Sequence, residues 1–162
     1  QEKLGTNWVP GSVCDAPVGL QDLMPTLLDA GNASCPSHLD GKSLLPLMSQ
    51  QKEKVRERIL GEFGLEGKRT LMLCDGRWKY IWYEEDGQEL LFHIEEDPDE
   101  RTNLVTKEHD VAITWRNNLI RLLSQREADP AVKAGKLQSS GGVLSEKEKA
   151  FMTSNRGARG LH

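Results

Sequence analysis

Histidines and cysteines are the residues of this chain that could act as nucleophiles, acid–base groups or metal ligands. The four histidines are scattered, and no HxH or HExxH spacing brings two imidazoles to one metal ion; they are His38, His93, His109 and His162. The three cysteines lack CxxC spacing and predict neither a disulfide framework nor a structural zinc site; they are Cys14, Cys35 and Cys74.

Carboxylates gather at residues 84–86 and 95–97, both at predicted turns. Neither run has the oxygen-ligand spacing of a calcium loop. The chain also lacks a glycine-rich phosphate loop and a GxSxG elbow. A hydrolase needs a nucleophile, a base or metal, and a group that stabilises the developing charge. The residues alone therefore predict a small domain with no catalytic residue and no metal ligand.

Residues 62–104, together with the short apolar run just before them, carry the strongest structural pattern. Four short apolar runs, at 59–60, 70–73, 78–83 and 90–94, are separated by turn residues. Two of the turns contain Asp-Gly, the strongest short-range hairpin signal because both residues tolerate positive φ. We therefore expect an antiparallel meander of about four strands. In the third run, alternation places Trp78, Tyr80 and Trp82 on one face and Lys79 on the other, which predicts either a central strand or the floor of a surface.

Helical spacing appears on both sides of this meander. Residues 20–28 predict a helix with Asp22 as its cap, Pro25 in its first turn and Gly31 as a left-handed C′ residue. Ser43 can cap a short piece at 44–48. Thr106 can cap a longer helix from about 107 to 127, which should lie across the sheet. The apolar stripe of this longer helix is Val111, Trp115, Leu119 and Leu122.

Three regions follow from these patterns. Residues 1–58 form a linker with short helices, 59–128 the sheet with its C-terminal helix, and 129–162 an extended tail with a capping-box turn at 145–148. We expect the charged segment 50–58 to be solvated. The fold class is α+β, with a small antiparallel sheet packed against a long C-terminal helix.

Length and charge exclude some classes of protein. The 162 residues allow one domain with a core. A net charge of −4 and the lack of a basic stripe argue against a nucleic-acid partner. No apolar run approaches the roughly 20 residues of a membrane helix.

Six segments of the chain, taken in order, match the signature motifs of one enzyme family. Residues 18–31 resemble its PVxxxDLxPTLLDLAG helix, and residues 40–47 its DGxSLLPLL segment. The others are Gly61-Glu62, residues 75–82, residues 89–92 and residues 97–104, which resemble GEH, DGRYKYIW, EQLFDLE and DPxExxNL. Over about residues 13–127 the chain therefore resembles the C-terminal end of a type I (arylsulfatase-like) sulfatase of the alkaline phosphatase superfamily.

The resemblance implies a fragment of a larger α/β sulfatase fold, whose partner is a missing N-terminal catalytic domain. The family hydrolyses sulfate esters with a formylglycine nucleophile, made from a Cys-x-Pro-x-Arg motif, and with calcium. Both belong upstream of this region, and Cys35-Pro36-Ser37-His38 does not match the motif. We therefore expect this chain to be inactive alone, to bind neither cofactor, and to help the whole enzyme act on a sulfated small molecule or glycan.

Two residues are candidates for facing the substrate in the whole enzyme. Glu62 follows a strand and precedes a glycine-containing loop, and Lys79 is a cation that could meet an anion. The simpler interpretation, which we favour, is that Glu62 makes a local salt bridge and Lys79 is a solvated strand residue. Phe63 and His93 depart from the family's usual histidine and aspartate.

Two alternatives stay open. A phosphonate or phosphate monoester hydrolase of the same superfamily shares the fold and differs upstream, and a non-catalytic interaction module would use the aromatic strand or the basic tail. A dissected domain should leave an apolar face open where the rest of the enzyme docked. We therefore expect the face of the first helix, with Leu23, Leu27 and Leu28, to be partly uncovered.

Overall fold

The computed structural model describes residue 11, residues 13–49 and residues 51–142, so the helical turn expected at 145–148 lies outside the described residues. The chain divides into two compact units. The helical unit comprises Gln1–Ile59 and Cys74–Gly76, and the sheet unit comprises Leu60–Leu73 and Arg77–His162. Among the described residues, no helix is long and apolar enough to cross a membrane.

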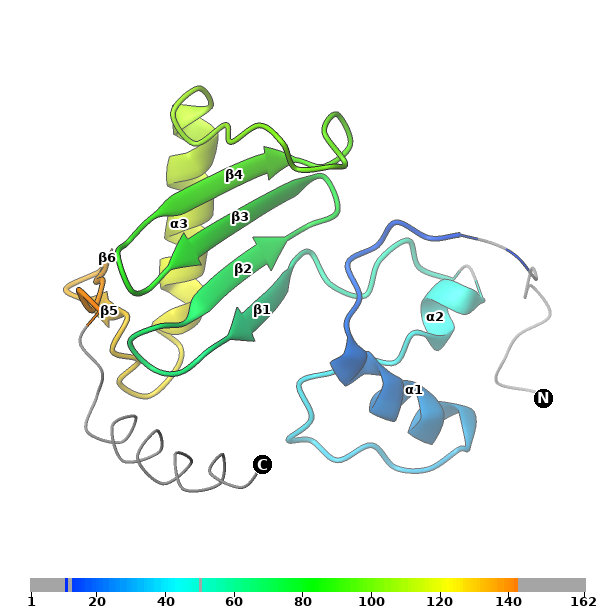
Figure 1. Ribbon diagram of the computed structural model, residues 1–162. Helices are drawn as coiled ribbons and strands as arrows, with labels where there is room; N and C mark the ends of the chain where they lie inside the picture. The colour runs from blue at the N-terminus through cyan, green and yellow to red at the C-terminus, as the bar shows by residue number, and fades with distance from the viewer. Residues whose placement is uncertain (1–10, 12, 50, 143–162) are drawn as a thin grey trace, which may run out of the picture. The chain divides into compact units, whose positions relative to one another are not determined.

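The predicted meander is confirmed. Its four strands are β1 (Ile59–Phe63), β2 (Thr70–Cys74), β3 (Trp78–Tyr83) and β4 (Glu89–His93), in the order β1-β2-β3-β4 (Figure 1). The β3–β4 pair is antiparallel. At the turns that precede and follow β3, Gly76 and Gly87 have φ of 96° and 78°, the left-handed region that glycine adopts without strain.

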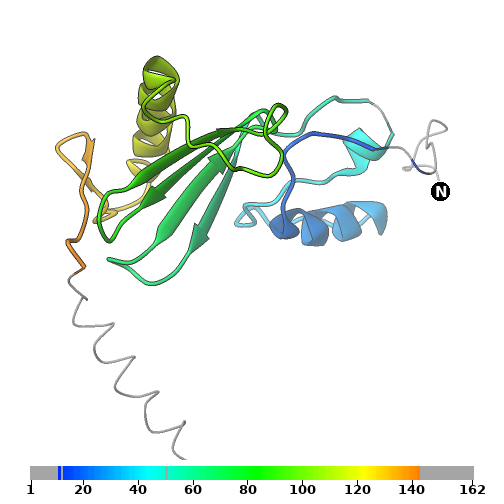
Figure 2. The same cartoon turned by 45° about the horizontal axis from the view of Figure 1, so that its top comes forward.

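Helix α3 (His109–Leu123) covers one face of this sheet (Figure 2). Tyr80 and Trp82 of β3 are buried against Trp115 and Leu119 of α3, which confirms both the expected strand face and the helical stripe. The sheet unit thus has its own apolar core. The helix begins after Glu108 rather than after Thr106, and no side chain caps it, so the expected Thr106 cap is wrong.

The segment after Asp129 differs from the expected extended tail. Its described part contains a hairpin of β5 (Val132–Lys133) and β6 (Lys136–Leu137). Ala134 and Gly135 form the two-residue turn with φ of 50° and 73°, the combination that suits a tight hairpin. Strand β6 contacts α3, and the Ser140 amide donates to the Glu84 carbonyl at 2.8 Å.

The helical unit contains a 3₁₀ turn, η2 (Leu20–Asp22), then α1 (Leu23–Ala30) and α2 (Leu45–Met48). Pro25 occupies the first turn of α1, as expected. Gly31 has φ of −82°, so the expected left-handed glycine is wrong; the left-handed residue is the next one, Asn32, with φ of 56°. Helix α2 begins after Leu44 and has no side-chain cap, so the expected Ser43 cap is wrong, although Ser43 accepts a hydrogen bond from the Leu45 amide at 3.3 Å.

The apolar face of α1 is open, as expected. Leu27 is 70% exposed and Leu23 is 54% exposed, while Leu28 is half-buried. Leu20 and Met24 are exposed beside them. Isolated exposed leucines are ordinary, whereas these four exposed apolar side chains follow one another along η2 and α1.

Candidate functional site

A cluster of charged side chains lies at one end of the sheet and includes one of the two residues proposed from the sequence. Its centre is the buried guanidinium of Arg69. Arg69 donates from Nε and Nη2 to Glu84 at 2.8 Å, from Nη2 to Asp129 at 2.8 Å, and from Nη1 to Glu62 at 3.0 Å. Arg126 closes the cluster by donating to Glu62 at 2.7 Å and Asp129 at 3.2 Å.

Chain topology brings these charges together. Arg69 directly precedes β2, Glu84 directly follows β3, and Glu62 lies in β1, so adjacent antiparallel strands place all three at one end of the sheet. Asp129 follows α3 and arrives from the helix layer. Sequence analysis missed Arg69 and Asp129 because their carboxylate–guanidinium pairing spans 60 residues and leaves no local pattern.

The charged side chains of this cluster are mostly buried, and their ion pairs connect the ends of the strands to the segment after α3. The Glu84 and Asp129 side chains are each 3% exposed. The hydrogen bonds that Arg69 donates to Glu84, and then to Asp129, raise the pKa of Arg69 despite its burial. Burial alone would raise the pKa of Asp129, but its bonds to Arg69, Ala131 and other donors outweigh that effect and lower it. All the cluster's buried carboxylates therefore have partners, as buried charges require.

Glu62 sits at the rim of the cluster. Its side chain is 31% exposed, and both of its carboxylate oxygens are engaged by arginines. This is the local salt bridge of the simpler interpretation. A substrate-facing role for Glu62 stays a prediction.

Lys79 belongs to a separate ion pair. Its ammonium donates to both oxygens of Glu100 at 2.8 Å, and both side chains are partly buried. The structure thus gives each of the two sequence-predicted residues its own partners within the sheet unit. A substrate-facing role for Lys79 also stays a prediction.

The helical unit has its own charged centre at Asp22. This fully buried carboxylate accepts hydrogen bonds from the Gly19 amide and the Lys42 amide, both at 2.8 Å, and pairs with the Arg56 guanidinium. Hydrogen bonding to Arg56 is the largest cause that lowers the Asp22 pKa to about 2.

These contacts correct two expectations. Asp22 makes no capping bond to α1, because its carboxylate is bonded to the 3₁₀ turn before that helix and to the Lys42 loop. Arg56 lies in the segment expected to be solvated, yet its side chain is nearly buried against Asp22.

The described residues do not fit a resident calcium ion or a formylglycine. Within residues 13–49 and 51–142, no group of three or more histidine, cysteine or acidic side chains is arranged to hold a metal. The carboxylates that do converge are neutralised by Arg69 and Arg126. Cys14, Cys35 and Cys74 are free thiols, and none begins a Cys-x-Pro-x-Arg segment.

The known proteins to which this chain is similar include an arylsulfatase, a second sulfatase and a phosphonate monoester hydrolase. An arylsulfatase of Clostridium perfringens is 34% identical over 119 residues, which cover 72% of this chain and 25% of that protein. The solved structure of a 2-O GAG sulfatase matches 76% of this chain and 30% of its own with a TM-score of 0.60 and 24% identity, which shows the fold. The phosphonate monoester hydrolase of Agrobacterium radiobacter matches 64% of this chain and 24% of its own, with a TM-score of 0.53 and 25% identity.

These matches agree with the predicted fold, an α+β part of a sulfatase fold. The chain spans about a quarter of the length of the Clostridium relative. The family model described as N-sulphoglucosamine sulphohydrolase, C-terminal, matches residues 3–128, more than half of the sequence. The chain therefore belongs to this family of sulfatase C-terminal regions, which is described as N-sulphoglucosamine sulphohydrolase, C-terminal.

Proposed function

We propose that this chain is the C-terminal part of an enzyme that hydrolyses sulfate esters, and that it docks there onto the catalytic domain through α1. The observation that carries the docking proposal is the open apolar face of Leu20, Leu23, Met24 and Leu27. The Clostridium arylsulfatase is about four times as long as the segment matched to this chain. We therefore assign this face to the corresponding remaining part of the full-length protein. Burying such a surface favours association in proportion to its apolar area.

Catalysis belongs to that remaining chain under this proposal. Among the described residues, no group of three or more histidine, cysteine or acidic side chains could hold a metal ion, and the sequence contains no Cys-x-Pro-x-Arg motif. Calcium and formylglycine are therefore proposed for the full-length enzyme only. The role of the present chain is structural, with Glu62 and Lys79 as the side chains proposed to border the substrate cleft.

The direct test of activity compares two proteins. The intact mass and reading frame of the natural protein show whether a Cys-x-Pro-x-Arg segment and an aspartate-rich metal site precede Gln1. If they do, that protein should release sulfate from an aryl sulfate when calcium is present. The 162-residue chain alone should release none. Sulfate release by the short chain, or a natural protein that begins near Gln1, would overturn the assignment.

A second test addresses docking. Leu27→Gln removes apolar surface from the exposed face of α1 while keeping a helix-compatible side chain. We expect it to lower the melting temperature of the full-length enzyme by several degrees but to leave the 162-residue chain unchanged. Ala30→Gln, at another exposed position of α1, is the matched control. Equal effects in the two proteins would show that α1 does not dock.

Lys79→Met separates the two roles of that lysine. If Lys79 contacts an anionic substrate, the KM of the Lys79→Met enzyme should rise. The Glu100→Gln enzyme, which loses only the ion-pair partner of Lys79, should keep its KM unchanged. If both variants leave KM unchanged, Lys79 serves only its ion pair.

A second candidate activity is hydrolysis of phosphonate or phosphate monoesters. It is favoured by the fold similarity to the Agrobacterium phosphonate monoester hydrolase. Assaying the full-length protein on matched aryl sulfate and aryl phosphonate esters distinguishes the two, because the better substrate by kcat/KM identifies the reaction.

A further inference from the structure

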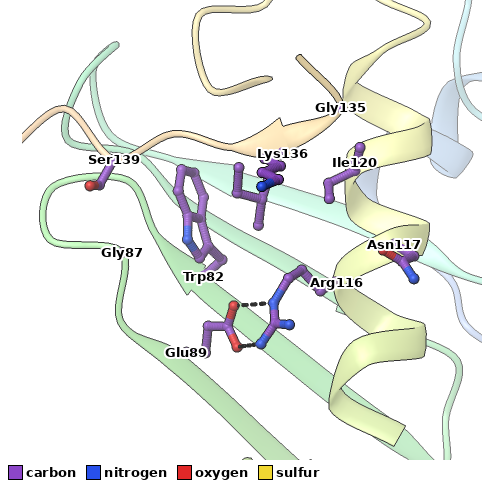
Figure 3. Close-up of a pocket in the computed structure, with 10 residues that line it drawn as sticks. Trp82, Gly87, Glu89, Arg116, Asn117, Ile120, Gly135, Lys136 and Ser139 are labelled. Atoms are coloured by element: carbon purple, nitrogen blue, oxygen red, sulfur yellow. Dashed lines mark hydrogen bonds and ion pairs between the residues drawn. The ribbon is translucent and has the colours of Figure 1, made fainter. Parts of the chain in front are cut away.

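A cavity of about 510 Å³ lies in the sheet unit, between the β3–β4 turn, α3 and the β5–β6 hairpin (Figure 3). Its volume falls within the range of small-molecule sites, roughly 300–1,000 Å³. None of its lining residues belongs to the Arg69 cluster, and neither Glu62 nor Lys79 lines it. The cavity is therefore separate from the residues considered for the sulfatase reaction.

One wall of the cavity is cationic. Arg116 of α3 pairs side-on with Glu89 of β4, through Nε at 2.6 Å and Nη2 at 2.5 Å, and remains about one-third exposed. That pairing fixes the position of the guanidinium. Lys136 of β6 is exposed and also lines the cavity. Two cations and one carboxylate leave a net positive charge that suits a monoanion.

The other wall is apolar with polar groups beside it. Ile120 and Leu137, both half-buried, supply its accessible apolar surface, and the buried Trp82 packs beneath them with 2% of its surface exposed. Asn117 and Ser139 add an amide and a hydroxyl, which can bond to ligand hydroxyl groups. Figure 3 shows these side chains arriving from β3, from α3 and from the segment around the β5–β6 hairpin.

We propose that this cavity binds an acidic monosaccharide, whose single sulfate or carboxylate group lies against Arg116 and Lys136. The ring lies along the half-buried Ile120 and Leu137, and the hydroxyl groups bond to Asn117 and Ser139. A cationic wall beside an apolar wall with neutral hydrogen-bonding groups matches a ligand that is anionic, ring-shaped and rich in hydroxyls. The proposal does not rest on the catalytic assignment.

Site-resolved acetylation tests this proposal in the full-length protein. Lys133 and Lys136 face each other across the β5–β6 hairpin, but only Lys136 lines the cavity. Acetylation of each lysine by a limiting amine-reactive reagent is followed by peptide mass spectrometry, with glucose 6-sulfate, glucuronate or glucose at about 10 mM, a concentration suited to millimolar affinity. We expect an acidic sugar to slow acetylation of Lys136 about threefold or more and to leave Lys133 unchanged.

The three sugars also identify the anion. Protection by glucose 6-sulfate alone assigns a sulfated ligand, protection by glucuronate alone assigns a uronic acid, and protection by both assigns an anionic sugar of either kind. Equal protection by glucose would overturn the anionic assignment. No protection of Lys136 by any of them would overturn the site.

A pair of variants provides the second measurement. Lys136→Gln should weaken calorimetric binding of the protecting sugar about three- to tenfold, whereas Lys133→Gln, with the same change of charge on the same hairpin, should not. Neither variant should change kcat for an aryl sulfate, so a failure of this site is distinguishable from a failure of the sulfatase proposal. Equal weakening by the two variants would reduce the effect to net charge and overturn the site.

Discussion

The helical unit and the sheet unit each contain a buried charged centre, and the central charges of the two have opposite signs. In the helical unit one buried carboxylate, Asp22, collects two backbone amides and the Arg56 guanidinium. In the sheet unit one buried guanidinium, Arg69, collects the carboxylates of Glu62, Glu84 and Asp129.

The surroundings of the two centres differ as much as their charges. The Arg69 cluster belongs to a unit that has an apolar core of sheet and helix side chains. Asp22 belongs to a unit whose short helix leaves its apolar face exposed. The sheet unit therefore has a source of stability besides its ion pairs, whereas the helical unit depends more heavily on polar contacts.

The largest expected effect comes from removing the centre of the sheet unit. Arg69→Met leaves Glu84 and Asp129 buried without their main cation. We expect the free energy of unfolding to fall by about 3–5 kcal/mol, measured by urea denaturation. Arg101→Met is the control, because Arg101 pairs with Asp99 on the exposed surface. A loss no larger than that of the control would mean that the cluster contributes little.

The second effect tests whether the helical unit depends on Asp22. Asp22→Asn leaves the nearly buried Arg56 without a charged partner and removes one acceptor oxygen. We expect local stability to fall by about 2–3 kcal/mol, measured by hydrogen exchange of the Gly19 and Lys42 amides. Asp40→Asn, at an exposed position of the same unit, should change nothing. Equal loss of protection at the Leu91 amide of β4 would contradict the separation of the two units.

Acid should weaken the Asp22 centre in a defined window. The pKa of Asp22 is about 2 in the folded chain against 3.8 as its ordinary value. The lowered pKa contributes stability that is present above the unfolded pKa and is lost as pH falls from about 4 toward 2. The loss should approach about 2 kcal/mol. Subtracting the pH profile of Asp22→Asn from that of the unchanged protein isolates this contribution, and a flat difference over that window would contradict it.

Sequence patterns predicted the elements whose signals are local. The β3 alternation, the Asp-Gly turns and the α3 stripe each repeat within a few residues, so the meander and its covering helix could be expected before the structure. The β5–β6 hairpin was missed because strands of two residues are too short to show a period. Its turn also uses Ala134 in the left-handed region, where composition predicts glycine or asparagine.

The charged centres could not be predicted in the same way. Asp22 and Arg56 are 34 positions apart, and Arg69 and Glu84 are 15 apart. A charged residue in sequence looks the same whether it is solvated or buried in a pair, and only the fold decides which. For this reason Glu62 could be proposed from its place after a strand and before a glycine-containing loop, whereas Arg69, which binds it, has no such local signal.

The smallest expected effect separates the two kinds of carboxylate within the Arg69 cluster. Glu62→Gln affects a rim residue, so the free energy of unfolding should change by less than about 1 kcal/mol. Glu84→Gln affects a buried acceptor of four hydrogen bonds and should cost more, about 2–3 kcal/mol. Kinetics of the full-length enzyme then test the proposed cleft role. A raised KM in Glu62→Gln with little loss of stability would place Glu62 beside the substrate, whereas unchanged kinetics would leave it as the outermost partner of Arg69 and Arg126.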